Sequence, residues 1–431
     1  MLRRKLYDEL LAWKTRTDKR ALIVSGARQV GKTFIINAFV QDNYAHVIFI
    51  NFEETPRFKQ AFEGDLDTDT IISQLSVLLP DAVFEPSTTA IVLDEVQSCP
   101  QAITALKFFT LDGRFDVIAT GSLLGMSYKE VSSFPVGYTD RLELFSLDFE
   151  EFLWANRIST ETIETLRKCF ASRRPVPPAI HSRMLELFRT YIVVGGMPAV
   201  VNTYVQTQHF GEVLKLQRNI IRDYTDDIAK YAEGAEKTKA RACFLSIPQQ
   251  LARDYKKFRY STVDKNGSSR KYAGSLMWLY DAGIINFCYN LSRIELPLEG
   301  NVISDVFKVY MRDTGLLVAM LEDGAQADVL AGNLGIYKGA LYENIIADIF
   351  GKAGKRLYYY EYRSFIEMDF IIRHDNTATA IEVKSADHTK SKSLNALINN
   401  YNVPHGIKLS AKNVGTTGPI DTYPLYMAMF L

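Results

Sequence analysis

Residues 21–33 read ALIVSGARQVGKT, and this stretch decides the fold expected for the first part of the chain. Its first five residues are apolar or small, as in a buried strand. The next eight match the pattern GxxxxGK[ST], and the residues FIINAFV that follow predict a helix. A strand, a glycine-containing loop and a helix in this order predict an α/β domain with a parallel sheet and a phosphate-binding loop.

The loop after this strand carries residues suited to binding a nucleotide. Glycine lets the backbone curl so that its N–H groups face a phosphate, and the helix N-terminus adds a positive end. Lys32 is expected to reach the β- and γ-phosphates as a catalytic residue, and Thr33 to hold Mg²⁺. The expected nucleotide-binding residues here are Gly26, Ala27, Arg28, Gln29, Val30, Gly31, Lys32 and Thr33. The alternative, a chance match in a turn, is disfavoured by the strand–loop–helix context.

A second strand ends in two acidic residues within TTAIVLDEVQSCP, residues 88–100. Asp94 is expected to bind the nucleotide complex by positioning Mg²⁺ through its water shell. Glu95 is placed to act as the general base that polarises the attacking water. Two solvated acids capping a strand are the alternative, which the phosphate-binding loop earlier in the chain makes weaker.

A third strand ends in hydroxyl-bearing residues within FDVIATGSLLG, residues 115–125. A hydroxyl of Thr120 or Ser122 is expected near the γ-phosphate of the nucleotide. The alternative is a helix N-cap for the segment that follows.

Composition limits the function classes and the compartment. The chain has 431 residues, and its 50 Lys and Arg equal its 50 Asp and Glu, so no field attracting nucleic acid to the whole chain is expected. The four cysteines lie far apart and form no CxxC pair, which favours a reducing cytoplasm. The charged N-terminus is unlike a signal peptide, and apolar runs are too short to cross a membrane.

Four domains are expected from the order of patterns along the chain. They are an α/β domain with the phosphate-binding loop at 1–150, a helical region at 151–235, a region of short helices with a Gly-Ser turn at 236–300 and a mixed α/β domain at 301–431. The Gly-Gly-Met-Pro stretch at 195–198 predicts a helix break and suggests a hinge.

The third of these domains contains a basic stretch. Residues 236–271 hold ten Lys or Arg against three acids, a balance that supports contacts with phosphates of DNA or RNA. The expected contacts are Lys256, Lys257, Arg259, Arg270 and Lys271, with Tyr255, Phe258 and Tyr260 between them. The alternative is a module used only for protein packing, with a solvated basic face.

The last domain carries a second candidate site. Glu382 and Lys384 are two apart in a strand and share a face, and Asp369 belongs to the preceding strand across a turn at Asp375 and Asn376. Asp369, Glu382 and Glu343 are expected metal ligands, and Glu367 could assist. Asp369, Glu382 and Lys384 are the expected catalytic residues, with Lys384 orienting water or steadying charge on the phosphate. A cross-strand salt-bridge cluster is the alternative.

Motifs along nearly the whole chain resemble those of AAA-like P-loop ATPases of bacteria and archaea that are fused to a C-terminal domain of unknown function. The motifs are GARQVGKT, IVLDEVQ, ATGS, LFSLDFEEFL, VVGGMPAVV, FKVYMRDTGLL, GALYENIIADIF and EMDFII with AIEVKSA. The resemblance implies an ATPase core, a helical lid, a winged helix and a restriction-endonuclease-like end. The Glu-Asp-Glu-x-Lys set itself resembles the PD-(D/E)xK nuclease core.

One position departs from the family pattern. Tyr138 stands where relatives often carry Arg or Lys, so no arginine finger is assigned, and Arg141 and Arg28 are the alternatives. Two functions follow as hypotheses. In the first, ATP and Mg²⁺ drive action on DNA or RNA, with a metal-dependent nuclease site. In the second, the chain is an ATP-regulated switch that binds a protein partner. A homo-oligomer is compatible with both.

Overall fold

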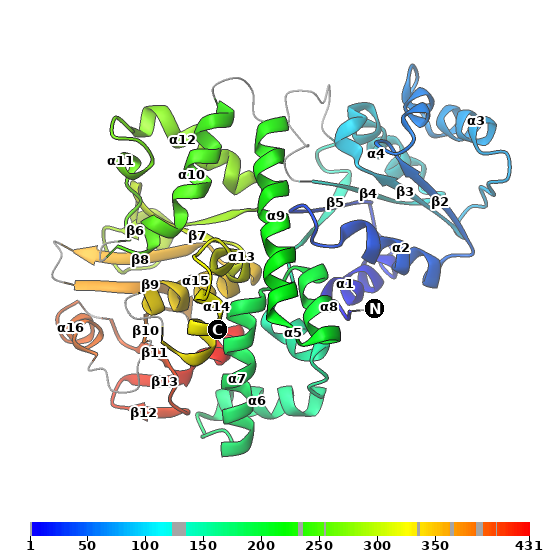
Figure 1. The fold of residues 1–431 in the computed structure, drawn as a ribbon. Coiled ribbons are helices and arrows are strands. Elements are labelled where there is room, and N and C mark those ends of the chain that lie inside the picture. The colour runs from blue at the N-terminus through cyan, green and yellow to red at the C-terminus, as the bar shows by residue number, and fades with distance from the viewer. Residues whose placement is uncertain are drawn as a thin grey trace. The chain divides into compact units, whose positions relative to one another are not determined.

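The computed structural model describes residues 2–122, 135–231, 236–253, 256–333, 337–362, 366–384, 391–401 and 403–431 (Figure 1). The chain forms two compact units, Arg3–Ser146 and Leu147–Leu431. Among the described residues, no helix combines the length and the apolar character needed to cross a membrane.

The first unit is built on a parallel sheet with the strand order β2-β3-β4-β1-β5. The parallel α/β core expected from the sequence is thereby confirmed. The elements are α1 (Lys5–Lys14), β1 (Ala21–Gly26), α2 (Lys32–Asn43), β2 (His46–Asn51), η1 (Pro56–Phe62), α3 (Thr68–Leu78), β3 (Thr89–Asp94), η2 (Val96–Ser98), α4 (Pro100–Asp112), β4 (Asp116–Ser122) and β5 (Thr139–Leu144).

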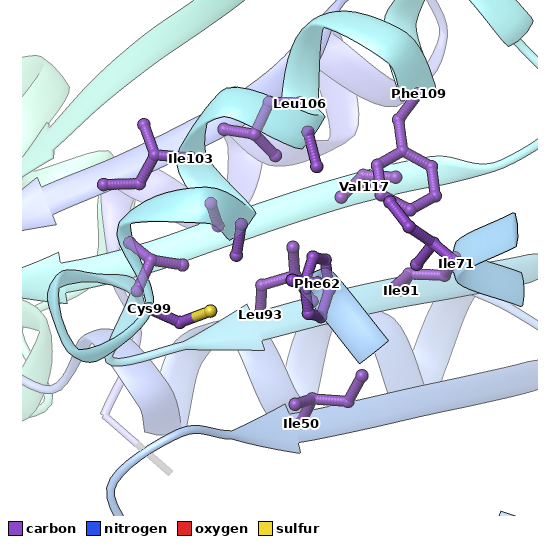
Figure 2. Close-up of a cluster of buried hydrophobic side chains, with 14 of the residues drawn as sticks. Ile50, Phe62, Ile71, Ile91, Leu93, Cys99, Ile103, Leu106, Phe109 and Val117 are labelled. Atoms are coloured by element: carbon purple, nitrogen blue, oxygen red, sulfur yellow. The ribbon is translucent and has the colours of Figure 1, made fainter. Parts of the chain in front are cut away.

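Helices cover both faces of this sheet because its strands are apolar on both sides. In β3, Ala90 and Val92 pack in a core with side chains of α1 and α2, whereas Ile91 and Leu93 pack in a second core with α3 and α4. Figure 2 shows the second core, in which Ile103, Leu106 and Phe109 of α4 lie over the strands. This burial on two faces holds the strand ends that carry the site.

The second unit begins with helices. They are α5 (Phe149–Ala155), α6 (Thr160–Ser172), α7 (Pro178–Val194), α8 (Pro198–Thr207), α9 (Phe210–Tyr231), α10 (Glu236–Leu251), α11 (Tyr260–Val263) and α12 (Ser269–Asp281). The break between α7 and α8 coincides with the predicted Gly-Gly-Met-Pro stretch.

A mixed sheet follows, with the strand order β12-β13-β11-β10-β9-β8-β6-β7. Its elements are β6 (Ile285–Leu291), η4 (Leu298–Asn301), β7 (Val302–Met311), α13 (Thr314–Ala319), α14 (Ala325–Ala331), α15 (Tyr337–Lys352), β8 (Leu357–Tyr362), β9 (Ile366–His374), β10 (Thr377–Val383), α16 (Lys392–Asn400), β11 (Gly406–Ser410), β12 (Gly415–Thr417), β13 (Ile420–Pro424) and η5 (Leu425–Phe430).

This sheet joins segments that the sequence analysis separates. Strand β6 pairs with β7 and also with β8, so the expected boundary at residue 300 falls between two strands of one sheet. The expected turn between β9 and β10 is present, with Asp375 at φ 45° and Asn376 at φ 59°. Asn and Asp tolerate this left-handed backbone better than most residues, so the turn fixes the β9–β10 register.

Candidate functional site

The first candidate site lies where parallel strands of the first unit end. Strand β4 lies between β1 and β3, so the loop after β1 and the acids after β3 flank the end of β4. In open α/β sheets, this carboxyl edge is the usual place for a ligand. The sheet order thus gathers three motifs that are far apart in the sequence.

The phosphate-binding loop has the backbone that its glycines predict. Gly31 has φ 92° and Gln29 has φ 63°, so two residues of the loop adopt left-handed backbone before α2 begins at Lys32. A Cβ atom on Gly26 would lie 2.2 Å from the carbonyl oxygen of Leu144 on the neighbouring strand β5. Glycine is therefore required at position 26 for strand packing as well as for the loop.

Lys32 is held inside the loop. Its Nζ donates to the carbonyl oxygens of Gly26, at 3.1 Å, and Ala27, at 2.9 Å, and the residue is 8% exposed. Burial lowers the pKa of Lys32 to about 8, although the charges of Glu95 and Asp94 act in the opposite direction. A phosphate group would replace the two carbonyl partners with a stronger, charged acceptor.

Thr33 and Asp94 meet across the strand ends. The Thr33 hydroxyl donates to Asp94, with Oγ1 3.1 Å from Oδ2, and Asn51 Nδ2 donates to the same oxygen at 3.0 Å. Burial raises the pKa of Asp94, and Glu95 adds to the effect. A hydroxyl beside a carboxylate is a hard-oxygen donor set that fits Mg²⁺, so Thr33 and Asp94 are the residues that would hold it.

Glu95 and Thr120 complete this site. Glu95 adopts left-handed backbone, with φ 54°, and its carboxylate accepts a hydrogen bond from Gln97 Nε2. The buried hydroxyl of Thr120 has no hydrogen-bond partner in the structure, which fits a role in contacting a ligand. Ser122 is the last residue of β4, and its side chain lies outside the described residues.

The two basic residues weighed beside Tyr138 lie in different parts of the domain. Arg28 belongs to the loop, where its charge acts to lower the pKa of Lys32. Arg141 lies in the middle of β5, opposite Ile23 of β1, and not at the strand end that carries the loop. The Tyr138 carbonyl accepts a hydrogen bond from Thr110, and Lys107 Nζ lies 5.2 Å from the centre of the Tyr138 ring. The assignment of an arginine finger stays open.

The second candidate site lies in the sheet of the second unit. The β9–β10 ladder pairs Phe370 with Ile381, which makes Asp369 and Glu382 neighbours on adjacent strands. Asp369 Oδ2 accepts a hydrogen bond of 2.7 Å from the backbone N–H of Val383. These two acids are therefore brought together, as the spacing predicts.

Glu382 and Lys384 share a strand face and form an ion pair. Lys384 Nζ lies 2.7 Å from Glu382 Oε1. The second oxygen of Glu382, Oε2, is buried and has no hydrogen-bond partner in the structure. A buried carboxylate oxygen without a partner fits a metal ligand, because burying it otherwise costs free energy.

Glu343 lies in α15 and is buried, at 5% exposed, and it is paired with two cations. Its carboxylate accepts hydrogen bonds from Lys256 and, at 3.1 Å, from the Tyr310 hydroxyl, and Lys308 Nζ lies 3.8 Å from Oε2. Burial raises the pKa of Glu343, but Lys256 and Lys308 outweigh burial, and the net pKa is lowered. Glu343 is thus held as a carboxylate.

Lys308 is the central cation of this cluster. It is completely buried in β7, its Nζ lies 2.7 Å from Glu367 Oε1, and it lies 4.6 Å from the centre of the Tyr359 ring. Burial raises the pKa of Asp369 to about 7, and the charge of Glu343 adds to this effect. In the described part of the chain, no three His, Cys, Asp or Glu side chains are grouped closely enough to hold a metal ion. The strands thus bring two expected ligands together, Asp369 and Glu382, whereas Glu343 is paired with Lys256 and Lys308.

The expected nucleic-acid residues do not share one environment. The side chains of Lys257, Arg259, Arg270 and Lys271 are exposed, and Lys271 pairs with Asp264 at 2.5 Å. Lys256 differs from the expectation of a phosphate contact on the surface, because its ammonium is paired with Glu343 and its side chain is 15% exposed. Tyr255 lies outside the described residues.

Comparison with known proteins bears on the first site. Residues 18–153 match the model of the AAA domain, a range that holds the loop, both acids and the end of β4. Residues 18–153 are called the AAA-like domain below. Residues 185–327 and 338–423 match two domains of unknown function, DUF8612 and DUF4143.

Individual relatives are distant. Over 211 residues the chain is 24% identical to an uncharacterised protein of Methanocaldococcus jannaschii, which covers 48% of this chain and 40% of that protein. The chain thus spans less than half the length of that relative. A Walker-type ATPase of Pyrococcus abyssi is similar at a TM-score of 0.42 and 12% identity, covering 74% of this chain and 96% of that one. The structure of Aeropyrum pernix ORC1 in complex with DNA is similar at a TM-score of 0.29 and 13% identity. That match covers 76% of this chain and 90% of the ORC1 chain.

Asn51 and Gln97 of the AAA-like domain were missed in the sequence. Asn51 Oδ1 accepts hydrogen bonds from the backbone N–H groups of Glu53 and Glu54. Asn51 Nδ2 donates to Asp94, so this side chain links the loop after β2 to the acid. Gln97 packs closely against Gly121: a Cβ atom placed on Gly121 would lie 2.6 Å from Gln97 Oε1. The available signal for Asn51 was a polar residue at the end of a strand, but its partner depends on strand order.

The depressed pKa of Lys32 predicts proton uptake when ATP binds to the AAA-like domain. Phosphate stabilises the charged ammonium, so the bound state holds more protons than the free state once the pH exceeds about 8. The dissociation constant for ATP should therefore rise as the pH rises through 8, by up to about tenfold per pH unit. Calorimetry in two buffers of different ionisation enthalpy measures the protons taken up. Lys32→Arg, which does not titrate, should remove this uptake.

Proposed function

We propose that the chain is a Mg²⁺-dependent ATPase whose nucleotide state drives action on nucleic acid, with a metal-dependent nuclease site near the C-terminus. The observation that carries the ATPase part is the meeting of Lys32, Thr33 and Asp94 at the ends of β1 and β3. Glu95 follows directly in the chain.

Each residue of the AAA-like domain has a role in the proposed hydrolysis. The loop N–H groups and Lys32 bind and orient the β- and γ-phosphates. Glu95 accepts the proton of the attacking water, and Gln97 holds its carboxylate in place. Mg²⁺, held by Thr33 and Asp94, would neutralise charge developing on the phosphates. The Thr120 hydroxyl lies at the end of β4, where it could distinguish the presence of the γ-phosphate.

The proposed nucleic-acid module is the segment α10–α12 with the β6–β7 hairpin, the order of elements in a winged helix. Its exposed cations are Lys257, Arg259, Arg270 and Lys271. If this face binds DNA, the logarithm of the affinity should fall steeply with the logarithm of the salt concentration. Residues 151–235, which contain most of α5 and all of α6 to α9, keep the proposed role of a helical lid.

The proposed nuclease site rests on α15, β9 and β10. The elements follow in the order α15-β8-β9-β10-α16-β11. Glu343 lies on α15, Asp369 lies on β9, and Glu382 and Lys384 lie at the end of β10. Asp369 and Glu382 would hold a divalent metal that activates water and polarises the phosphate. Lys384 is placed to steady charge that develops on the phosphate oxygens.

The second candidate function is an ATP-regulated switch that binds a protein partner, in which the nuclease-like domain is structural. The pairing of Glu343 with Lys256 and Lys308 favours it, because an acid whose charge is already balanced by two cations needs no metal. Burial of the basic 236–271 face against a partner would also agree with this function.

A paired assay separates the two functions. ATP turnover and cleavage of labelled single- and double-stranded DNA and RNA are followed with Mg²⁺ or Mn²⁺. Lys384→Ala should abolish cleavage, by about 10²-fold or more, and leave ATP turnover unchanged. Lys392→Ala, an exposed lysine in α16, is the matched control. ATP hydrolysis by the wild type without any cleavage would favour the switch.

A further inference from the structure

Lys256 reaches the candidate nuclease site from outside the α15–β11 region. Its side chain is mostly buried, at 15% exposed, and donates to Glu343, a residue 87 positions further along the chain. The Lys256 charge also bears on Asp369, whose pKa it lowers. Lys256 therefore lies at the carboxylates that the PD-(D/E)xK resemblance assigns to a metal.

The segment that carries Lys256 is fixed by contacts on both sides of Phe258. The Phe258 N–H donates to the Phe307 carbonyl in β7 at 2.8 Å, and the two rings stack with centres 6.0 Å apart. Gln250, which is buried, donates to the Arg259 carbonyl at 2.9 Å and accepts from its N–H at 3.1 Å. The backbone is thus anchored just beyond Lys256, and its side chain can move while the segment stays in place.

The charge of the cluster limits how many cations it can hold. With all three carboxylates counted as charged, as they would be beside a metal, the acids Glu343, Glu367 and Asp369 and the cations Lys256 and Lys308 sum to a net charge of −1. A divalent cation would change it to +1 with Lys256 in place and to zero with Lys256 withdrawn. A net positive charge inside a poorly solvated cluster is unfavourable. The neutral arrangement, in which the divalent cation replaces Lys256, is therefore favoured.

We propose that Lys256 is a resident counter-ion that competes with a divalent metal for Glu343, so that the nuclease-like site completes its ligand set only when Lys256 withdraws. This inference rests on the proposed nuclease-like site and adds a residue that controls it. Lys256 is a positioning residue, because it acts through Glu343 and not on a substrate.

Lys308 is unsuited to the same exchange. It projects from the interior of a strand and is completely buried, with contacts to Glu343, Glu367 and the Tyr359 ring. Lys256 precedes α11 in a segment without regular secondary structure and keeps partial access to solvent. Of these two cations, Lys256 is the one that can leave without breaking the sheet.

The first test measures metal binding directly. Binding of Mn²⁺ to nucleotide-free full-length chain is followed by the electron paramagnetic resonance signal of free Mn²⁺. Lys256→Met keeps the length of the side chain and removes its charge, and it should tighten Mn²⁺ binding by about tenfold or more. Lys257→Met, an exposed neighbour, should leave binding unchanged. Adding Glu343→Gln to Lys256→Met should abolish the gain.

A second test needs no substitution. If Mn²⁺ displaces Lys256 from Glu343, linkage requires that Lys256 becomes more reactive toward an amine-specific reagent as Mn²⁺ is added. Mass spectrometry of the labelled peptide should show modification at Lys256 rising severalfold with Mn²⁺, with Lys257 as the internal reference. Labelling of Lys256 that stays constant across the Mn²⁺ titration contradicts the exchange.

The outcomes separate this inference from the nuclease proposal. Equal Mn²⁺ affinity in wild type and Lys256→Met, together with cleavage by the wild type, overturns the competition and leaves the nuclease intact. Tighter Mn²⁺ binding that persists when Glu343→Gln is added to Lys256→Met also overturns the competition, because Glu343 is then not the ligand. Absence of both Mn²⁺ binding and cleavage in every variant removes the metal site and the competition together, while ATP turnover tests the AAA-like domain independently.

Discussion

Replacing Glu95 with Gln is expected to lower ATP turnover by about 10²–10⁴-fold and to leave ATP binding close to that of the wild type. Gln matches Glu in shape but cannot accept the proton of the attacking water. Lys32 and the loop N–H groups, which are proposed to contact the phosphates, are not altered by the substitution. Loss of the Glu95 charge would lower the pKa of Lys32 further, so binding is compared below pH 8. Turnover is measured by phosphate release, and binding by calorimetry with a non-hydrolysable ATP analogue.

The controls for this prediction come from the same strand ends. Glu54→Gln removes an exposed acid after β2 and should leave turnover unchanged. Lys32→Ala should weaken binding as well as turnover, because it removes the ammonium that faces the phosphates. Full turnover in Glu95→Gln would mean that another group accepts the proton.

Replacing Gly196 with Ala is expected to lower the free energy of unfolding of the second unit by about 3 kcal/mol. A Cβ atom at this position would lie 2.1 Å from the carbonyl oxygen of Leu147, so the backbone must move. That movement would also disturb the 2.7 Å hydrogen bond from the Leu147 N–H to the Gly196 carbonyl. Close packing thus explains why glycine is needed at position 196, and the hinge suggested by the sequence stays a prediction.

Unfolding of the second unit can be followed separately because two of the three tryptophans, Trp154 and Trp278, belong to it. A Trp13→Phe background removes the fluorescence of the first unit. Gly339→Ala is the matched control, since the site has open space in a helix and Ala should raise stability by about 0.5 kcal/mol. Equal urea midpoints for Gly196→Ala and its parent would show that the packing tolerates a methyl group.

Local patterns in the sequence were sufficient for features that depend on neighbouring residues. The loop at 26–33, the acids Asp94 and Glu95 and the Asp375-Asn376 turn all depend on short-range chemistry, and the structure places each of them at the predicted end of a strand. The pairing of Asp369 with the Glu382 strand followed from the same reasoning, since a tight turn sets the register.

Features that depend on distant contacts could not be predicted in this way. Asn51 contacts Asp94 because β2 pairs with β3, and the sequence does not contain that order. A run of basic residues predicts a solvated face, but it does not reveal that one of them, Lys256, has a carboxylate partner far along the chain. The expected domain boundary at residue 300 divides one sheet, because β6, which precedes it, pairs with β7 and β8, which follow it.

The contacts of Leu147 have a mechanical consequence. Leu147 opens the second unit, and its carbonyl accepts hydrogen bonds from Tyr191, at 2.7 Å, and from Lys352, at 3.1 Å. Lys352 and Glu343 lie on the same helix, about 14 Å apart along its axis at 1.5 Å per residue. A helix resists compression along its axis, so a displacement of the chain at Leu147 has a stiff path to the carboxylate that holds Lys256.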